Sequence, residues 1–371
     1  MTAIQSFLVK KTDYSQTLID SRLSEDMPEL RSGEVLLKVD CFALTANNIT
    51  YAAMGDALRY WEFFPAANGW GKIPVWGFAD IVESNCEGLA VGERVYGYFP
   101  MDSHLRVSPQ SITPASFMDG APHRTDLSDI YNQYIRCDKD PLYTVESEAY
   151  QMLLRPLFTT SFLLDDFFAD QEFLGANTIV LTSASSKTAL GMAFLLHHNR
   201  SERDYNYEIV GLTSPGNLEF VNSLGCYDRV ISYDDITSLD SEKPTVTVDF
   251  AGNGEVLGGL HAHLNENLKY SCLVGASHWD QRAGMPTDLK GPAPVMFFAP
   301  SQAAKRLKEW GGPGFQTRIA SVWTLFLQSV EGWMTVETAQ GADALDAVYQ
   351  EVLSGHFDPK IGHIVSQGGT Q

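Results

Sequence analysis

The sequence has few cysteines, a deficit of basic residues and no long apolar run. Its five cysteines are widely scattered and form no CxxC pair, which argues against a structural zinc site and favours a reducing cytoplasm. Lys and Arg total 26 against 46 Asp and Glu, a formal net charge of −20. The negative electrostatic potential of such a chain repels a phosphate backbone, so nucleic-acid binding is disfavoured.

Membrane and secretory signals are also missing. No apolar run approaches the roughly 18–20 residues that a spanning helix needs, and residues 1–15 lack the apolar core and cleavage site of a signal peptide. We therefore expect a cytoplasmic protein without a membrane partner. At 371 residues, two domains are the default expectation.

The first part of the chain reads as a small β-barrel. Residues 35–39 and 94–98 are short apolar runs, each entered from a Gly-Glu turn. Residues 108–145 are polar and contain proline, and we expect them to form a long excursion from the barrel.

The pattern changes near Ser147. A helix is predicted over 147–168, with Pro156 as a kink or boundary. Apolar strands then alternate with amphipathic helices, which predicts a parallel sheet covered on both faces. Strands are predicted over 178–181, 209–212, 230–231, 245–250 and 271–274, and a helix is predicted over 218–224. After about residue 300 the chain is helical again, and it closes with a helix over 343–353 and a strand over 362–365.

The loop after the first of these strands is a candidate phosphate site, although it lacks the GxGxxG pattern. It follows a strand and opens a helix, and its small residues let backbone N–H groups approach a pyrophosphate. The alternative is a serine-rich helix cap with a solvated lysine. The candidate cofactor contacts are Ser183, Ser185, Ser186, Lys187 and Thr188.

The end of the second strand bears on cofactor choice. An NAD site usually has a carboxylate there for the ribose hydroxyl, but this chain has Thr213, Ser214 and Asn217 and no acid before Glu219. A neutral pocket tolerates a 2′-phosphate, so NADP(H) is predicted. A turn that uses Pro-Gly-Asn for backbone reasons is the alternative.

Five segments in order resemble the medium-chain dehydrogenase/reductase superfamily. They are GEVLLKV at 33–39, PVWGFA at 74–79 with VGERVYG at 91–97, LTS at 212–214 with SLGCYDRVISY at 223–233, VDFAG at 248–252, and GADA, LSG and PKIG within 341–362. The resemblance implies an α/β protein with a GroES-like β-barrel domain (1–146 and 301–371) and a doubly wound Rossmann domain (147–300). It also implies a homodimer, and it adds Tyr233, Gly252 and Gly275 to the expected cofactor contacts.

The chain departs from the zinc-dependent members of that superfamily. It has Trp76-Gly77-Phe78 where they carry Gly-His-Glu, and it has no cysteine cluster, so a tetrahedral N/S site is not expected. The resemblance is therefore to the zinc-free quinone and enoyl reductases, as a divergent branch.

In those relatives the segment 44–55 passes beside the nicotinamide. Reduction of an activated alkene or carbonyl needs a proton donor and hydrogen-bond donors aimed at the developing oxyanion. Tyr51 or Tyr60 can supply the proton, and Asn47 or Asn48 can donate to the oxyanion. The alternative is an Asn-Asn turn with a structural tyrosine.

Two functions follow. The first is an NADPH-dependent reductase of an activated alkene, quinone or carbonyl compound, with an apolar or aromatic small-molecule substrate suggested by seven aromatic residues between 60 and 78. The second is a nucleotide-binding sensor or structural protein that kept the fold and lost catalysis. Four residues of 108–145 are further candidates for a polar substrate end: His123, Arg124, Tyr131 and Tyr134.

Overall fold

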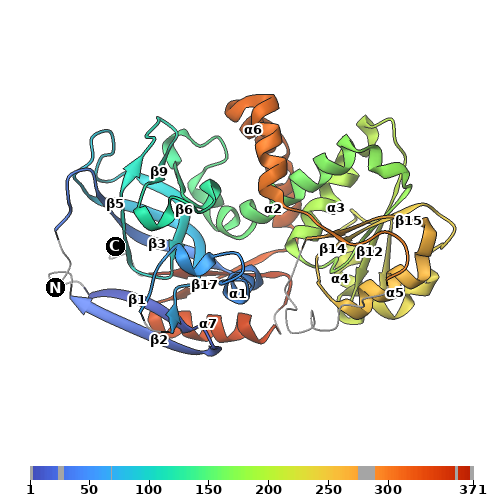
Figure 1. The fold of residues 1–371 in the computed structure, drawn as a ribbon, viewed down its shortest axis with the longest axis horizontal. Coiled ribbons are helices and arrows are strands. Elements are labelled where there is room, and N and C mark those ends of the chain that lie inside the picture. The colour runs from blue at the N-terminus through green and yellow to red at the C-terminus, as the bar shows by residue number, and fades with distance from the viewer. Residues whose placement is uncertain (1–2, 24–28, 68, 275–288, 356–357, 368–371) are drawn as a thin grey trace. The chain divides into compact units, whose positions relative to one another are not determined.

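The computed structural model describes residues 3–23, 29–67, 69–274, 289–355 and 358–367. The chain forms two compact units: unit 1 comprises Met1–Pro156 with Val330–Gln371, and unit 2 comprises Leu157–Ser329. The fold of each is drawn in Figure 1.

Within its described residues, unit 1 contains two sheets and two complete α-helices. A three-stranded sheet has the order β2-β1-β4, and a nine-stranded sheet has the order β17-β18-β3-β5-β6-β10-β9-β8, with β7 pairing β3. The strands are β1 (Ala3–Lys10), β2 (Asp13–Leu23), β3 (Val35–Leu44), β4 (Trp70–Gly71), β5 (Pro74–Ser84), β6 (Arg94–Pro100), β7 (His104–Val107), β8 (Pro109–Gln110), β9 (Ser116–Asp119), β10 (Gln133–Arg136), β17 (Thr335–Gln340) and β18 (Ile361–Ser366). The helices are α1 (Ala46–Ala53) and α7 (Ala342–Ser354).

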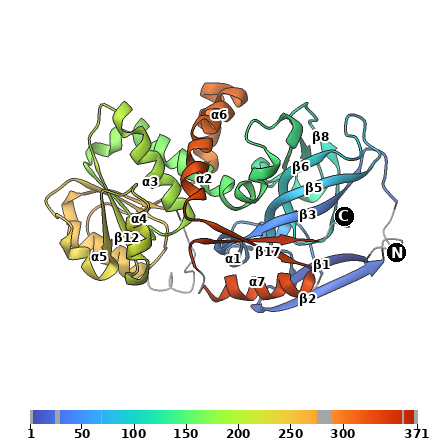
Figure 2. The ribbon, with the colours of Figure 1, turned by 180° about the vertical axis from the view of Figure 1, so that it is seen from behind.

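The C-terminal helix completes the core of unit 1. α7 lies beside the β1–β2 hairpin, although more than 300 residues separate them (Figure 2). The buried Tyr349 of α7 donates a hydrogen bond from its hydroxyl to Tyr14 O at 2.8 Å. The two ends of the chain therefore share one hydrophobic core.

The polar segment 108–145 is part of this unit, in contrast to the expected excursion. β9 pairs with both β8 and β10, and β10 pairs with β6, so the segment extends the large sheet by three strands. These strands are only two to four residues long, which is why they leave little periodic signal in the sequence.

Unit 2 contains one six-stranded parallel sheet in the order β13-β12-β11-β14-β15-β16. This is the strand order 3-2-1-4-5-6 of the doubly wound Rossmann fold. The strands are β11 (Thr178–Leu181), β12 (Glu208–Thr213), β13 (Arg229–Ser232), β14 (Thr245–Asp249), β15 (Leu268–Leu273) and β16 (Val295–Met296), and the helices are α2 (Glu148–Asp170, begun in unit 1), α3 (Lys187–Asn199), α4 (Leu218–Ser223), α5 (Gly254–Leu264) and α6 (Ala299–Glu331).

Both faces of the parallel sheet are covered, as predicted. Ile179 and Leu181 pack with α2 and α3, whereas Val180 between them packs with α5 on the other face. Figure 1 shows α3 above the sheet and α4 and α5 below it. Alternate side chains of a strand point to opposite faces, so burial on both sides requires the continuous apolar run seen in the sequence.

The observed units end at different residues from the predicted domains, 1–146 with 301–371 and 147–300. α2 continues through Pro156 as one helix, and the division between the units falls within it. Most of α6 belongs to unit 2, because Phe326 stacks on Phe158 of α2 at 4.5 Å and Arg306 pairs with Asp166. These contacts join residues far apart in sequence, so the sequence pattern did not reveal them.

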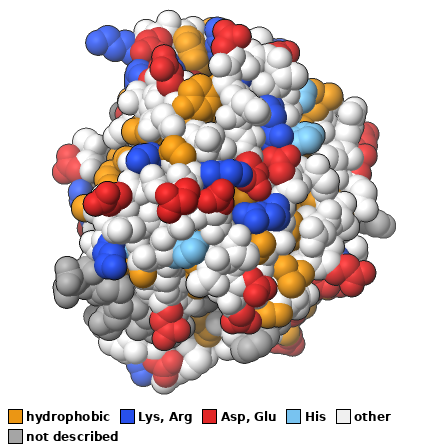
Figure 3. All heavy atoms as spheres, turned by 90° about the vertical axis from the view of Figure 1, so that its right-hand side faces the viewer, with side chains coloured by type: hydrophobic (Ala, Val, Ile, Leu, Met, Phe, Trp, Pro, Cys, Tyr) orange, Lys and Arg blue, Asp and Glu red, His pale blue; other side chains and the backbone are white. Residues whose placement is uncertain are grey.

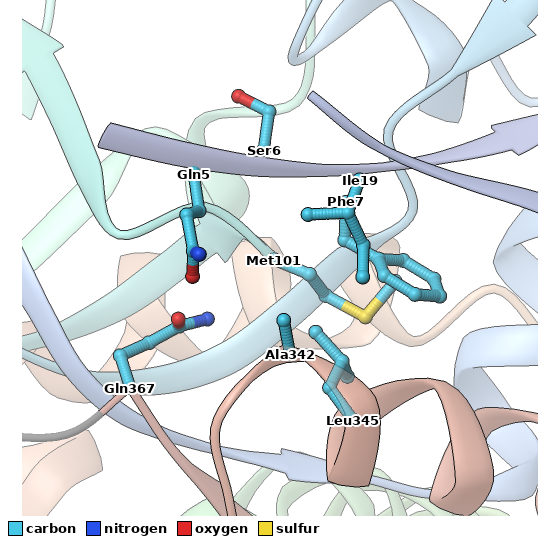
Figure 4. Close-up of a pocket in the computed structure, with 8 residues that line it drawn as sticks. All are labelled: Gln5, Ser6, Phe7, Ile19, Met101, Ala342, Leu345 and Gln367. Carbon is cyan, nitrogen blue, oxygen red and sulfur yellow. The ribbon is translucent and has the colours of Figure 1, made fainter. Parts of the chain in front are cut away.

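A small cavity lies in unit 1 between β1, β2 and α7, where the Gln5 and Gln367 amides face one another (Figure 4). Its volume of about 10 Å³ suffices for about one water molecule, so it does not suit a substrate. Among the helices in the described ranges, none combines the length and apolarity required to cross a bilayer.

Candidate functional site

The carboxyl ends of the unit 2 strands form a candidate cofactor site. β11 has β12 on one side and β14 on the other, so the strand order reverses at β11. Ligands of open α/β sheets bind at the carboxyl ends of the strands at such a switch point. The loop of residues 182–186 lies here and leads into α3.

Ser186 is the N-cap of α3, since its Oγ accepts from Ala189 N at 3.4 Å, and Lys187 and Thr188 form the first helical positions. A capped helix still directs its first N–H groups toward the loop, so the cap and phosphate binding are compatible.

The loop is held without glycines. Ser183 has a φ of 48°, in the left-handed region that usually favours glycine, and its N–H donates to the Tyr233 hydroxyl at 3.0 Å. Ala184 N donates to Leu212 O at 3.0 Å. Tyr233 therefore supports the loop backbone directly, and the missing GxGxxG pattern is replaced by bonds to neighbouring strand ends.

Three predicted cofactor residues come together beside this loop. The Asn217 amide nitrogen donates to Ser185 Oγ and to Ser214 Oγ, each at 3.1 Å. We call Ser185, Ser214 and Asn217 the hydroxyl–amide cluster. Thr213 lies beside it but is only 1% exposed, so its side chain belongs to the core. No carboxylate occurs between residues 213 and 218.

Asp249 is a residue of this region that the sequence reasoning did not assign. It is buried at the end of β14 and accepts hydrogen bonds from Thr182 Oγ1 at 2.5 Å and from Gly252 N at 3.2 Å. Gly252, expected to contact the cofactor, has a φ of +70° and forms this turn. The VDFAG motif at 248–252 was the sequence signal that could have identified Asp249. Gly275 lies outside the described residues.

A separate candidate site lies on α1 of unit 1, where Asn48 has a structural role. Its Oδ1 accepts from Thr45 N at 2.7 Å, and its Nδ2 donates to Pro74 O at 2.8 Å. The residue is 3% exposed. Asn48 therefore caps α1 and ties it to β5, and its amide is committed to the backbone.

Asn47 and Tyr51 are brought together one turn apart on α1. Asn47 Nδ2 donates to the Tyr51 hydroxyl oxygen at 2.7 Å, and the indole N–H of Trp76 donates to the same oxygen at 3.3 Å. Burial raises the pKa of the Tyr51 phenol, while the hydrogen bonds from Trp76 and Asn47 act in the opposite direction. The phenol is therefore protonated at neutral pH and is held by two donors.

Tyr51 belongs to a cluster of tyrosines that also contains Tyr60, Tyr98 and Tyr131. The ring centroids of Tyr51 and Tyr60 are 4.6 Å apart, and those of Tyr98 and Tyr131 are 4.7 Å apart. The Tyr60 and Tyr131 hydroxyls lie 3.3 Å apart. Burial raises the pKa of each of these phenols. Tyr60, the other residue predicted as a candidate proton donor, is thus next to Tyr51.

Tyr131 reaches this tyrosine cluster from the segment 108–145. The other three candidates of that segment are structural. Arg124 is 1% exposed and donates to Asp119 Oδ2 at 2.7 Å and to the Tyr134 hydroxyl at 3.2 Å. His123 is within hydrogen-bonding distance of a backbone carbonyl. The sequence reasoning named Tyr131 without ranking it, and it gave Trp76 and Tyr98 no specific role.

One group of potential metal ligands occurs in the described part of the chain: Asp40, Cys41 and Glu148. The Arg94 guanidinium donates to Asp40 at 2.7 Å and to Glu148 at 2.6 Å, so a cation already neutralises the carboxylates. Burial followed by the neighbouring Asp40 raises the pKa of the Cys41 thiol to about 12. Asp40 and Glu148 are therefore members of an ion-pair network around Arg94.

Comparison with solved structures identifies the class of fold. CurA from Vibrio vulnificus is 13% identical with a TM-score of 0.59 over 100% of both chains. A mutant form of the enoyl thioester reductase from Candida tropicalis is 11% identical with a TM-score of 0.56, and the quinone oxidoreductase from Coxiella burnetii is 10% identical with a TM-score of 0.54; both cover 99% of this chain and 100% of their own. The predicted α/β fold, a Rossmann sheet with a GroES-like β-rich unit, is confirmed.

Within this class, the chain belongs to the family described as "Protein of unknown function (DUF2855)", which matches residues 42–358. No curated protein matches the sequence.

Proposed function

We propose that the protein is an NADPH-dependent oxidoreductase that reduces an activated alkene, quinone or carbonyl compound without zinc. The observation that carries this proposal is the hydroxyl–amide cluster at the switch point of a Rossmann sheet. The fold neighbours support it, since one structure of CurA from Vibrio vulnificus is a complex with NADPH.

The residues of unit 2 fit this cofactor. The hydroxyl–amide cluster offers neutral donors where an NAD site has a carboxylate, and a 2′-phosphate is not repelled. Ser186 and the first turn of α3, which includes Lys187 and Thr188, supply N–H and cationic groups for a phosphate. NADPH, when bound, supplies the hydride of the reaction.

In unit 1, Tyr51 is the proposed proton donor. Its oxygen accepts from Asn47 and Trp76, which stabilises the charge that remains when the proton leaves. Asn47 also offers an amide for a substrate oxyanion. Tyr60, 4.6 Å from Tyr51 between ring centroids, is the reserve donor. Asn48 is not part of this set because its amide is committed to the backbone.

One observation bears on the second candidate, a nucleotide-binding sensor or a structural protein without catalysis, and it favours the structural form. The Ser183 N–H is already bound by Tyr233, so this group is not available to a pyrophosphate while that bond lasts. Nucleotide binding without any turnover would support this alternative.

We further propose a cytoplasmic homodimer that acts on a small apolar or aromatic molecule. All five cysteines are free. β16 is an edge strand whose Val295 and Met296 are 44% and 47% exposed, and such edges are templates for pairing with a second chain. On the face shown in Figure 3, basic side chains lie among acidic ones without a continuous basic patch in the described area.

The test is turnover, followed as loss of nicotinamide absorbance with a panel of enones, quinones and ketones. Tyr51→Phe removes the proton donor, and a positioned donor contributes about 10²–10⁴-fold. We therefore expect at least about a tenfold loss of kcat with unchanged NADPH affinity. Tyr14→Phe, on the β1–β2 hairpin of unit 1, is the matched control and should keep the parent rate. Parent-rate turnover by both Tyr51→Phe and Tyr60→Phe would overturn the assignment of the donor.

A further inference from the structure

Trp76 projects from β5 onto the Tyr51 hydroxyl, and its orientation is fixed by packing. Its indole stacks on Tyr96 with centroids 5.6 Å apart and an interplanar angle of 17°. It also contacts Tyr98, its cross-strand neighbour on β6, at 5.0 Å. The N–H that reaches Tyr51 at 3.3 Å is therefore held by two rings, and a change of rotamer would break both contacts.

The polarity of the bonds to Tyr51 is determined by its partners. An indole N–H and an amide NH₂ are donors only, so the Tyr51 oxygen accepts from both Trp76 and Asn47. A phenol oxygen that accepts two bonds directs its own proton in a third direction. Neither the indole N–H of Trp76 nor the Nδ2 of Asn47 can receive that proton.

Tyr98 is a third neighbour of Tyr51. Its ring meets that of Tyr51 edge-on, with centroids 5.6 Å apart, and its hydroxyl is fully buried. The Tyr98 hydroxyl makes no hydrogen bond among the described residues. A buried hydroxyl without a partner is rare, and a phenolate at Tyr51 would give it an acceptor.

We propose that Trp76 and Tyr98 are positioning residues that, with Asn47, form a three-donor pocket for the Tyr51 oxygen and direct its proton toward the substrate. This proposal rests on the proposed function for its chemistry. In the proton-transfer step the Tyr51 O–H bond breaks, the proton bonds to the substrate anion formed by hydride addition from NADPH, and the electron pair stays on the Tyr51 oxygen. The three donors stabilise that oxygen until solvent returns a proton.

The test measures the phenolate directly and needs no turnover. Tyr51 is replaced in the full-length protein by 3,5-difluorotyrosine, a more acidic phenol of similar shape, and its ionisation is followed by ultraviolet absorbance against pH. A hydrogen bond to a charged group contributes enough to shift a pKa by about one to two units. Trp76→Phe, which keeps an aromatic ring in place, should therefore raise the pKa of difluorotyrosine 51 by about that amount.

Two further variants make the result decisive. Tyr98→Phe should raise the same pKa, and Trp70→Phe, a change elsewhere in unit 1, should leave it unchanged. A pKa unaltered by both Trp76→Phe and Tyr98→Phe in folded protein overturns the proposal. If Trp76→Phe does not fold, Asn47→Ala and Tyr98→Phe decide the outcome by the same criterion.

Kinetics then separate this proposal from the proposed function. With an accepted substrate, Trp76→Phe should lower kcat about tenfold and leave NADPH affinity unchanged. Protein that titrates as expected but reduces no substrate supports the three-donor pocket and contradicts the reductase. Turnover with an unshifted pKa contradicts the pocket and leaves the reductase standing.

Discussion

Ser214 is the residue at which we propose that the cofactor is selected. It accepts from Asn217 in the hydroxyl–amide cluster at the end of β12, where an acid would hold the ribose hydroxyls of NAD. Ser214→Asp places a carboxylate there, and we expect NADPH affinity to fall at least about tenfold, or about 1.4 kcal/mol, through repulsion of the 2′-phosphate. The control is Ser214→Asn, because asparagine is similar in size to aspartate but neutral. Calorimetric titration of both variants with NADPH and with NADH measures the affinities. Equal losses for the two cofactors would contradict the assignment.

At the residue level, the sequence was informative where the site is local in the chain. Ser183, Ser185 and Ser186 were predicted because they follow an apolar strand, whereas Asn47 and Tyr51 were named because the family resemblance places the segment 44–55 beside the nicotinamide. The bond between Trp76 and Tyr51 was not predictable in this way. It depends on the tie of α1 to β5 through Asn48 and on the packing of the indole against β6, and no spacing in the sequence encodes either contact.

At the scale of elements, an unusual turn joins α2 to β11. Glu172, Phe173 and Leu174 have φ values of 49°, 52° and 53°, and Gly175 follows at 75°. Each left-handed non-glycine residue costs about 1–2 kcal/mol. Phe173 is 1% exposed and packs on Tyr207 with centroids 4.5 Å apart, and burial of a phenylalanine offsets that strain.

This turn predicts a stabilising substitution. Glu172 is exposed, so Glu172→Gly should relieve its backbone strain at little cost in contacts. Glycine also has more conformational entropy in the unfolded chain, which offsets part of this effect. We therefore expect the free energy of unfolding to rise by up to about 1 kcal/mol. Glu172→Ala, which removes the same side chain and retains Cβ, should give no gain. Denaturant unfolding of the two variants decides, and equal stabilities would contradict the strain.

The elements themselves were predicted unevenly. The strands of the parallel sheet were found because burial on both faces requires continuous apolar runs, as in β11. The short strands β8, β9 and β10 were missed because two to four residues carry no measurable alternation. Their pairing with β6 and with each other is long-range, and Arg124, buried in their midst with Asp119, has the composition of a surface residue.

On the scale of the whole molecule, buried tyrosines limit stability in alkali. Burial raises the pKa of Tyr51, Tyr98, Tyr131 and Tyr227 above the ordinary value, which is about 10 in an unfolded chain. Above that pH the unfolded chain releases protons that the folded protein retains. The contribution of these buried tyrosines to the free energy of unfolding is therefore complete below about pH 10. At higher pH it falls by roughly 1.4 kcal/mol per pH unit for each tyrosine.

We expect cooperative unfolding above about pH 10, with circular dichroism and tyrosinate absorbance changing together. The net charge of −20 also becomes more negative in alkali, but that repulsion is screened by salt, whereas the cost of ionising a buried phenol is not. The transition should therefore persist in 1 M salt, where the Debye length is about 3 Å. Tyr131→Phe removes one of these phenols and should make the pH dependence less steep by about one proton. If salt abolished the transition, or if tyrosinate formed before the protein unfolded, general charge repulsion or exposed phenols would explain it instead.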